Sequence, residues 1–263
     1  KCLWYNRAMS KKLIIGNWKM NPQSQKEAVL LFRNISESIK NIKNVDVVIC
    51  PPIPFISSIK QLKNKKIKIG AQNVFFESKG AYTGEISAQM LHDIGVDYVI
   101  VGHSERRAMG ETNEIINKKL ISSLKAGLIP ILCVGESNRG AHDGFYLATV
   151  REQLSLCLAN ISKSQIKQIV VAYEPVWALS STPDRHDSTP HDFEEMKIYI
   201  RKILTDMFGQ ATALSVCIIY GGSANKDNAG SYLSIGADGL LPGKASLDFK
   251  NFAKIVDIAG SIK

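Results

Sequence analysis

Short runs of apolar, mostly β-branched residues recur along the chain, and most are followed by a segment whose apolar positions have helical spacing. The runs are nearly continuous rather than alternating, which is typical of parallel strands covered by helices. Eight strands are expected, at Leu13–Trp18, Val45–Cys50, Ile67–Gln72, Tyr98–Gly102, Ile129–Val134, Ile169–Tyr173, Val216–Tyr220 and Gly239–Leu241. The pattern therefore predicts repeated βα units.

The segments between these runs carry apolar residues three and four positions apart, as on one face of a helix. Helices are expected at Gln25–Ile39, Glu85–Ile94, Asn113–Leu124, Leu147–Leu158, Asp192–Met207 and Phe249–Ile258. Alternation of strands and helices predicts the α/β class with a parallel sheet. Eight units favour a closed (β/α)8 barrel, although the pattern alone leaves an open sheet as an alternative.

The chain has 263 residues and no linker, composition shift or low-complexity tract, so we expect one barrel domain over residues 9–263. Residues 1–8 precede a Met-Ser-Lys-Lys sequence that is typical of a natural start. They lack the apolar core and cleavage site of a signal peptide. We therefore interpret them as a tag or leader outside the fold.

The composition of the chain limits which binding partners and which cellular compartment are expected. Five cysteines lie far apart without a C-x-x-C pair, which argues against disulfides or a zinc site and favours a reducing cytoplasm. No apolar run is long enough to span a membrane. The formal net charge of +9 is spread along the chain without a nucleic-acid-binding motif, so neither nucleic acid nor membrane is expected as a partner. A positive surface can also attract an anionic substrate.

Chemically active residues follow several of the predicted strands, at the end of a βα barrel where active sites form. Lys19, His103 and Glu174 would supply a cation, an electrophile and a base from three different strand ends. Glycine-rich turns at 221–223 and 242–246 can present backbone N–H groups to a phosphate. Each residue alone has a simpler structural interpretation, and only their joint occurrence favours a catalytic site.

A set of ordered motifs covers the chain from Lys11 to its end. They are Gly16–Asn21, Gly70–Asn73, Gly80–Glu85, Gly102–Arg107, Cys133–Glu136, Ala172–Ala178 and Tyr220–Ser223. In order and spacing the sequence closely resembles the triosephosphate isomerase family. The resemblance implies a TIM barrel and an aldose–ketose isomerase of glycolysis and gluconeogenesis that interconverts dihydroxyacetone phosphate and D-glyceraldehyde 3-phosphate. It implies no metal and no cofactor.

The resemblance also implies catalytic roles for five residues. Glu174 would be the base that moves a carbon-bound proton, and His103 a neutral imidazole that polarises the carbonyl. Lys19 and Asn17 would stabilise the developing enediolate. Glu105 would hold Lys19 or assist the proton relay.

Substrate binding is implied for a second set, which overlaps the first. Ser104 would hydrogen-bond Glu174 before substrate closes the site. The phosphate would be bound by backbone N–H groups at Ser180, Ser223, Gly243 and Lys244 and by the side chain of Lys19, while Asn17 would bind the substrate at its oxyanion.

The segment after Ala178 departs from the family pattern, which usually continues Ile-Gly-Thr-Gly-Lys. Here the corresponding lid is a few residues longer, lacks those glycines and contains Asp184, Arg185 and Asp187. We expect these charged residues to project into water rather than fill the pocket. The turn after the last strand also differs, with Pro242 and Lys244 where the family usually has valine and glycine.

The loop Asn73–Glu85 matches a segment that docks into a neighbouring subunit in this family. Phe75, Phe76 and Tyr82 would form an exposed apolar patch in a monomer. We therefore expect a homodimer, with Thr83 reaching toward the partner's active site.

Two alternatives remain open at this point. One is another phosphate-binding barrel enzyme, which would share the phosphate turns but not the three catalytic motifs. The other is a non-catalytic or weakly active barrel that binds phosphorylated ligands or a protein partner, which only the altered lid favours.

Overall fold

The computed structural model describes residues 11–139, 144–179, 182 and 185–262, so the expected extension at residues 1–8 lies outside it. Eight parallel strands form a closed barrel in chain order, and the predicted (β/α)8 TIM barrel is confirmed. The strands are β1 Lys12–Asn17, β2 Val45–Cys50, β3 Ile67–Ala71, β4 Tyr98–Val101, β5 Ile129–Val134, β6 Val170–Tyr173, β7 Cys217–Tyr220 and β8 Gly239–Leu240.

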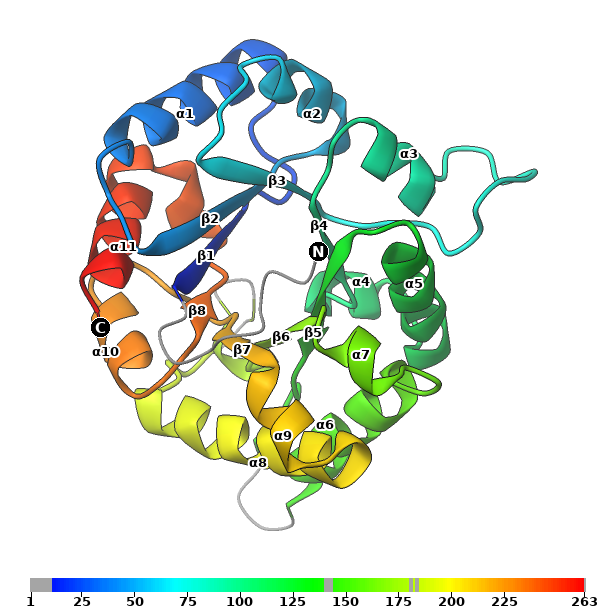
Figure 1. Ribbon diagram of the computed structural model, residues 1–263. Coiled ribbons are helices and arrows are strands. Elements are labelled where there is room, and N and C mark those ends of the chain that lie inside the picture. Colours follow the sequence, from blue (N-terminus) through cyan, green and yellow to red (C-terminus); the bar gives the residue numbers. More distant parts are fainter. Residues whose placement is uncertain (1–10, 140–143, 180–181, 183–184, 263) are drawn as a thin grey trace.

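Helices form a ring outside the strands (Figure 1). They are α1 Gln25–Ser38, α2 Ile53–Lys60, α3 Ala88–Asp93, α4 Ser104–Ala108, α5 Asn113–Lys125, α6 Phe145–Cys157, α7 Lys163–Ile166, α8 Pro190–Phe208, α9 Gln210–Ser215, α10 Ala229–Ser234 and α11 Phe249–Ser261. Two short 3-10 helices, η2 Val176–Ala178 and η3 Lys244–Leu247, follow β6 and β8. None of the described helices combines the length and apolar character needed to cross a bilayer.

The core has two layers because side chains alternate between the two faces of each strand. In β1, Leu13 and Ile15 belong to a cluster that fills the barrel interior together with Val48 of β2. Ile14 and Val47 belong instead to the cluster between strands and helices. Both faces are buried, which explains why the strands appear in the sequence as continuous apolar runs.

The predicted elements agree with the structure except in short helices. The ranges for β2 and β5 are the same as predicted, and α3 begins at Ala88 rather than Glu85 because the Ser87 hydroxyl accepts the Met90 N–H. Five short helices among the described residues were not predicted: α2, α4, α7, α9 and α10. Each is shorter than the roughly ten residues over which helical periodicity can be recognised.

The loop between β3 and α3 projects far from the barrel, as the cyan segment of Figure 1 shows. Within it the Phe75 ring lies 4.4 Å from Phe76 and 4.8 Å from Tyr82, measured between centroids. Lys119, which is almost fully buried, donates to Asn73 Oδ1 at 2.7 Å and pairs with Glu111. The base of the loop is thereby fixed to α5.

Closure of the barrel depends on β8, the shortest strand, which pairs with β1 at Leu13↔Gly239 and Ile14↔Leu240. A Cβ at position 239 would lie 1.9 Å from the Leu13 carbonyl oxygen. Gly239→Ala should therefore lower the free energy of unfolding by at least about 1–3 kcal/mol, as for overpacked sites. Urea unfolding followed by circular dichroism measures the change.

The matched control is Gly230→Ala in α10, where the added Cβ finds its nearest neighbour at 3.7 Å. Alanine favours a helix over glycine by about 0.5–1 kcal/mol, so this variant should be as stable as the parent or more so. Equal stability of the two variants would contradict the proposed role of Gly239 in closure.

Candidate active site

The carboxyl ends of several strands surround a cavity of about 380 Å³. Six of the predicted site residues line it: Asn17, Lys19, His103, Ser223, Gly243 and Lys244. Ser104 and Glu174 line an adjacent cavity of about 250 Å³. Glu105 contacts Lys19, and Ser180 lies outside the described residues. The structure thus brings together every predicted site residue that it describes.

Lys19 is held in the cavity by bonds to its main chain and its side chain. Its backbone is in the left-handed region, with φ of 51°. Asn17 Oδ1 accepts its N–H at 3.0 Å, and Gln72 donates to its carbonyl at 2.9 Å. The ammonium lies 2.5 Å from Glu105 Oε1. These contacts fix the position of the cation.

His103 caps α4, and its hydrogen bonds define which ring nitrogen carries the proton. Nδ1 accepts the Glu105 N–H at 3.2 Å, so it carries no proton of its own. The proton of the neutral ring is then on Nε2, which lies 3.4 Å from Glu174 Oε1. His103 is therefore placed as a neutral donor.

Glu174 is 2% exposed and loosely held. Its Oε2 accepts the backbone N–H of Ser104 at 3.1 Å, while Oε1 has no hydrogen-bond partner among the described residues. The expected Ser104–Glu174 bond is present, but it comes from the main chain, and the Ser104 hydroxyl is also without a described partner. A desolvated carboxylate with few bonds can turn without losing many contacts.

The two predicted phosphate turns lie against β1 and the lid. Asn17 N–H donates to the Pro242 carbonyl at 3.0 Å, which joins the ends of β1 and β8. The Ser223 hydroxyl donates to the Ala178 carbonyl at 3.0 Å, which joins the turn after β7 to η2. At the start of η3, the Lys244 N–H has no partner inside the helix and is available to an anion.

The lid after Ala178 differs from the expectation in one residue. Asp187 has a side chain that is 83% exposed, as expected, and Asp184 lies outside the described residues. Arg185, however, lines the cavity, and its guanidinium donates to the Ser223 hydroxyl at 3.2 Å. Its side chain is 40% exposed, but the expectation that it projects away from the pocket was wrong, because the Ser223 hydroxyl provides an acceptor across the cavity mouth.

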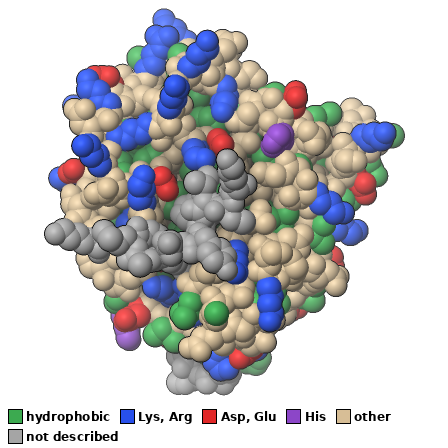
Figure 2. Space-filling model, viewed as in Figure 1, with side chains coloured by type: hydrophobic (Ala, Val, Ile, Leu, Met, Phe, Trp, Pro, Cys, Tyr) green, Lys and Arg blue, Asp and Glu red, His purple; other side chains and the backbone are tan. Residues whose placement is uncertain are grey.

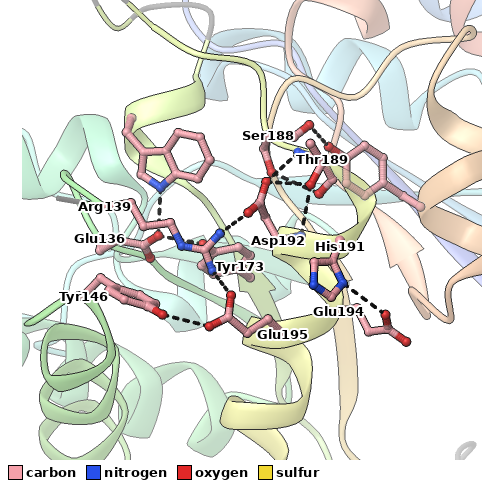
Figure 3. A network of polar contacts seen from close by, with 12 residues as sticks. Glu136, Arg139, Tyr146, Tyr173, Ser188, Thr189, His191, Asp192, Glu194 and Glu195 are labelled. Atoms are coloured by element: carbon pink, nitrogen blue, oxygen red, sulfur yellow. Dashed lines mark hydrogen bonds and ion pairs between the residues drawn. The ribbon is translucent and has the colours of Figure 1, made fainter. Parts of the chain in front are cut away.

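A buried carboxylate, Glu136, anchors the segment that leads into the lid (Figure 3). Its Oε1 accepts the Tyr173 hydroxyl at 2.7 Å and the Trp177 indole N–H at 2.8 Å. Burial raises the pKa of Glu136, and the two hydrogen bonds oppose that rise. Trp177 lies in η2, so Glu136 holds the first turn of the lid segment in place.

The other end of the lid is fixed by a capping box at the start of α8. Thr189 accepts the Asp192 N–H, and Asp192 accepts the Thr189 N–H at 2.8 Å. Arg139 pairs with Asp192 and Glu195 of α8, and it lies over the Trp177 ring at 5.8 Å (Figure 3). Both ends of the lid therefore belong to one polar network.

Four residues of this site were not predicted from the sequence: Gln72, Glu136, Arg139 and Arg185. Gln72 and Glu136 belong to motifs at strand ends, so their positions near the site could be predicted. Nothing in those motifs indicated which groups they would contact. Arg139 and Arg185 lie in irregular segments, where periodicity carries no information about direction. No group of His, Cys, Asp and Glu side chains suited to a metal ion occurs in the part of the chain that the structure describes.

Comparison with known proteins connects this geometry to a family. The triosephosphate isomerase family model matches residues 12–259. Triosephosphate isomerase of Carboxydothermus hydrogenoformans is 43% identical over 251 residues, which cover 94% of this chain and 98% of the relative. That of Caldanaerobacter subterraneus subsp. tengcongensis is 42% identical, over 95% of this chain and 100% of the relative. That of Clostridium botulinum is 40% identical over the same shares.

The Glu136 network predicts a pH-dependent stability. Because its folded pKa is raised, native Glu136 keeps a proton that the unfolded chain has lost, so stability falls as pH rises from about 4.3 through the folded pKa. Trp177→Phe removes one donor and raises the folded pKa further. We expect it to cost about 1.5–3 kcal/mol at pH 7.5 and clearly less at pH 4. Urea unfolding at both pH values measures this.

Tyr146→Phe is the control, because the Tyr146 hydroxyl donates to Glu195 Oε1 at 2.8 Å. Unlike Glu136, the Glu195 side chain is 43% exposed. Water replaces that donor, so its loss should be small at both pH values. A pH-independent loss in Trp177→Phe would show that packing, and not the buried charge, accounts for the effect.

Proposed function

The chain belongs to the triosephosphate isomerase family, and we propose that it interconverts dihydroxyacetone phosphate and D-glyceraldehyde 3-phosphate as an aldose–ketose isomerase. The observation that carries this proposal is that Lys19 and His103 line one cavity with the phosphate turns, while Glu174 lies 3.4 Å from His103. The reaction moves protons between two neighbouring carbons and their oxygens through an enediolate. Proton transfer alone accounts for the chemistry.

Glu174 acts as the base that removes the proton from one carbon and returns it to the next. It is 2% exposed, so bulk water is largely excluded from around the carboxylate. The carboxylate must turn from the Ser104 N–H toward the substrate cavity, and its few hydrogen bonds make that movement inexpensive. His103 donates from Nε2 to the substrate oxygens as charge develops on them.

Lys19 stabilises the developing oxyanion and the phosphate, and Asn17 contributes a second donor. Glu105 holds the ammonium and its charge offsets that of Lys19 before substrate binds. The phosphate is bound by N–H groups at Ser223, Gly243 and Lys244, together with Ser180 of the lid.

A coupled assay with D-glyceraldehyde 3-phosphate tests the proposal. Rapid formation of dihydroxyacetone phosphate supports it. No turnover by protein with the expected circular dichroism spectrum would favour a non-catalytic barrel that binds phosphorylated ligands. Nothing in the family match favours that alternative.

The base is tested by Glu174→Gln, which keeps the shape of the side chain and removes its basicity. We expect kcat to fall by at least about 10²–10⁴, the usual contribution of a general base, with the fold retained. Glu152→Gln makes the same change at an exposed residue of α6 that lines neither cavity, and it should have parental kcat. Near-parental activity in Glu174→Gln would remove this residue from the mechanism.

We also propose that the protein is a cytoplasmic homodimer joined through the loop Asn73–Glu85, with Thr83 near the partner's Asn17 and Lys19. The loop projects from the barrel, and Tyr82 is 45% exposed on it. Met20 and Met109, which follow β1 and α4, are also strongly exposed. Contact with a second copy would cover these side chains.

Lys and Arg side chains are spread over most of the face in Figure 2 and are denser around α1 and α2. This distribution is that of a solvated basic surface. We therefore expect neither nucleic acid nor a membrane as a partner.

Tyr82→Lys tests the dimer by placing a charge in the proposed interface. Light scattering should give a dimer for the parent and a larger monomer fraction for the variant at micromolar concentration. Leu30→Lys on α1 is the control, because Leu30 is 55% exposed and lies outside the loop. A monomeric parent at micromolar concentration would refute the dimer.

A further inference from the structure

Arg185 occupies the mouth of the substrate cavity although it belongs to the lid segment that departs from the family pattern. Its guanidinium donates a hydrogen bond of 3.2 Å to the hydroxyl of Ser223. The backbone N–H of that same serine is one of the proposed phosphate donors. A guanidinium in this place can reach the oxygens of a phosphate bound by the turn.

The charges around this end of the cavity favour an anion. Lys244 also lines the cavity and forms no ion pair with any residue that the structure describes. The ammonium of Lys19 is already paired with Glu105. Asp248 lines the cavity too, but its carboxylate accepts the N–H groups of Lys250 and Asn251 at the start of α11.

The partners of Arg185 leave it free to exchange acceptors. Its side chain is 40% exposed, and its ion pair with Asp187 spans 3.5 Å to a carboxylate that is 83% exposed. Such an exposed pair contributes little. The bond to the neutral Ser223 hydroxyl is weaker than a charge-assisted bond to a phosphate oxygen.

We propose that Arg185 is a phosphate-binding residue carried by the lid, which exchanges the Ser223 hydroxyl for the phosphate dianion of the substrate. This inference rests on the proposed isomerase function and adds to it a cation that the family's motifs do not supply. The guanidinium presents several N–H donors in one plane, which matches the geometry of phosphate oxygens. The phosphate thereby connects the lid to the turn after β7.

Loss of Arg185 should change KM rather than kcat. The phosphate carries the same charge in the substrate and in the transition state, so Arg185 binds both equally. Loss of such uniform binding raises KM and leaves kcat nearly unchanged. Inorganic phosphate, which would bind where the substrate phosphate binds, should inhibit less strongly when the Arg185 guanidinium is removed.

The test compares Arg185→Ala with the parent in the coupled assay. We expect KM for D-glyceraldehyde 3-phosphate and the inhibition constant of inorganic phosphate to rise together, each about 3- to 10-fold. Arg185→Lys keeps the charge without the planar set of donors and should lie between the two proteins. The differences should shrink in about 0.5 M salt, because the site is partly exposed.

A substrate without phosphate distinguishes binding from a structural role. For D-glyceraldehyde, kcat/KM should be equal in the parent and Arg185→Ala, because the guanidinium has no phosphate to bind. Equal losses for both substrates would show that Arg185 only supports the lid, and would overturn the proposal.

Arg151→Ala on α6 controls for net charge, because it removes the same charge from a side chain that is 46% exposed and does not line the cavity. It should have parental constants. A matching rise in KM would assign the effect to long-range attraction and overturn the proposal. An unchanged KM in Arg185→Ala, with the parent active, would overturn it without touching the isomerase assignment, whereas an inactive parent would refute that assignment itself.

Discussion

Closure of the barrel between β8 and β1 is the constraint on which the site depends. The two strands share only two residue pairs, at Leu13↔Gly239 and Ile14↔Leu240. Beyond them the chain continues the contact through the bond from Asn17 N–H to the Pro242 carbonyl. Asn17 and Lys19 lie at the end of one strand and the proposed phosphate turn follows the other, so the pairing sets how far the ammonium lies from the proposed phosphate donors. The proposed catalytic residues can converge only because the sheet is closed.

Much of this arrangement could be predicted from the sequence, since it depends on short-range rules. Buried parallel strands appear as continuous apolar runs, and the strand-end rule then places Lys19, His103 and Glu174 at one end of the barrel. The rest depends on packing. The short helix α10 leaves too few periodic positions to be recognised, and the direction of Arg185 is set by an acceptor, Ser223, that lies 38 residues away in the chain.

Glu174 likewise combines a position that the sequence predicts with a contact that depends on packing. Its position after β6 follows from the sequence, but its placement in the adjacent cavity depends on the Ser104 N–H, which comes from β4's end of the barrel. Glu136 is comparable, because its buried carboxylate is stabilised by Tyr173 and Trp177. In both cases the hydrogen bonds of a carboxylate at one strand end come from donors in other segments of the chain.

The backbone conformation of Lys19 lowers the stability of the fold. With φ of 51°, it occupies backbone space that a residue with a Cβ enters at a penalty of about 1–2 kcal/mol, and that glycine enters freely. Selection for thermal stability alone would therefore drive position 19 toward glycine and discard the ammonium. A library of variants ranked only by melting temperature would enrich well-folded barrels that have lost this proposed catalytic cation, so directed evolution of this protein must select turnover and stability together.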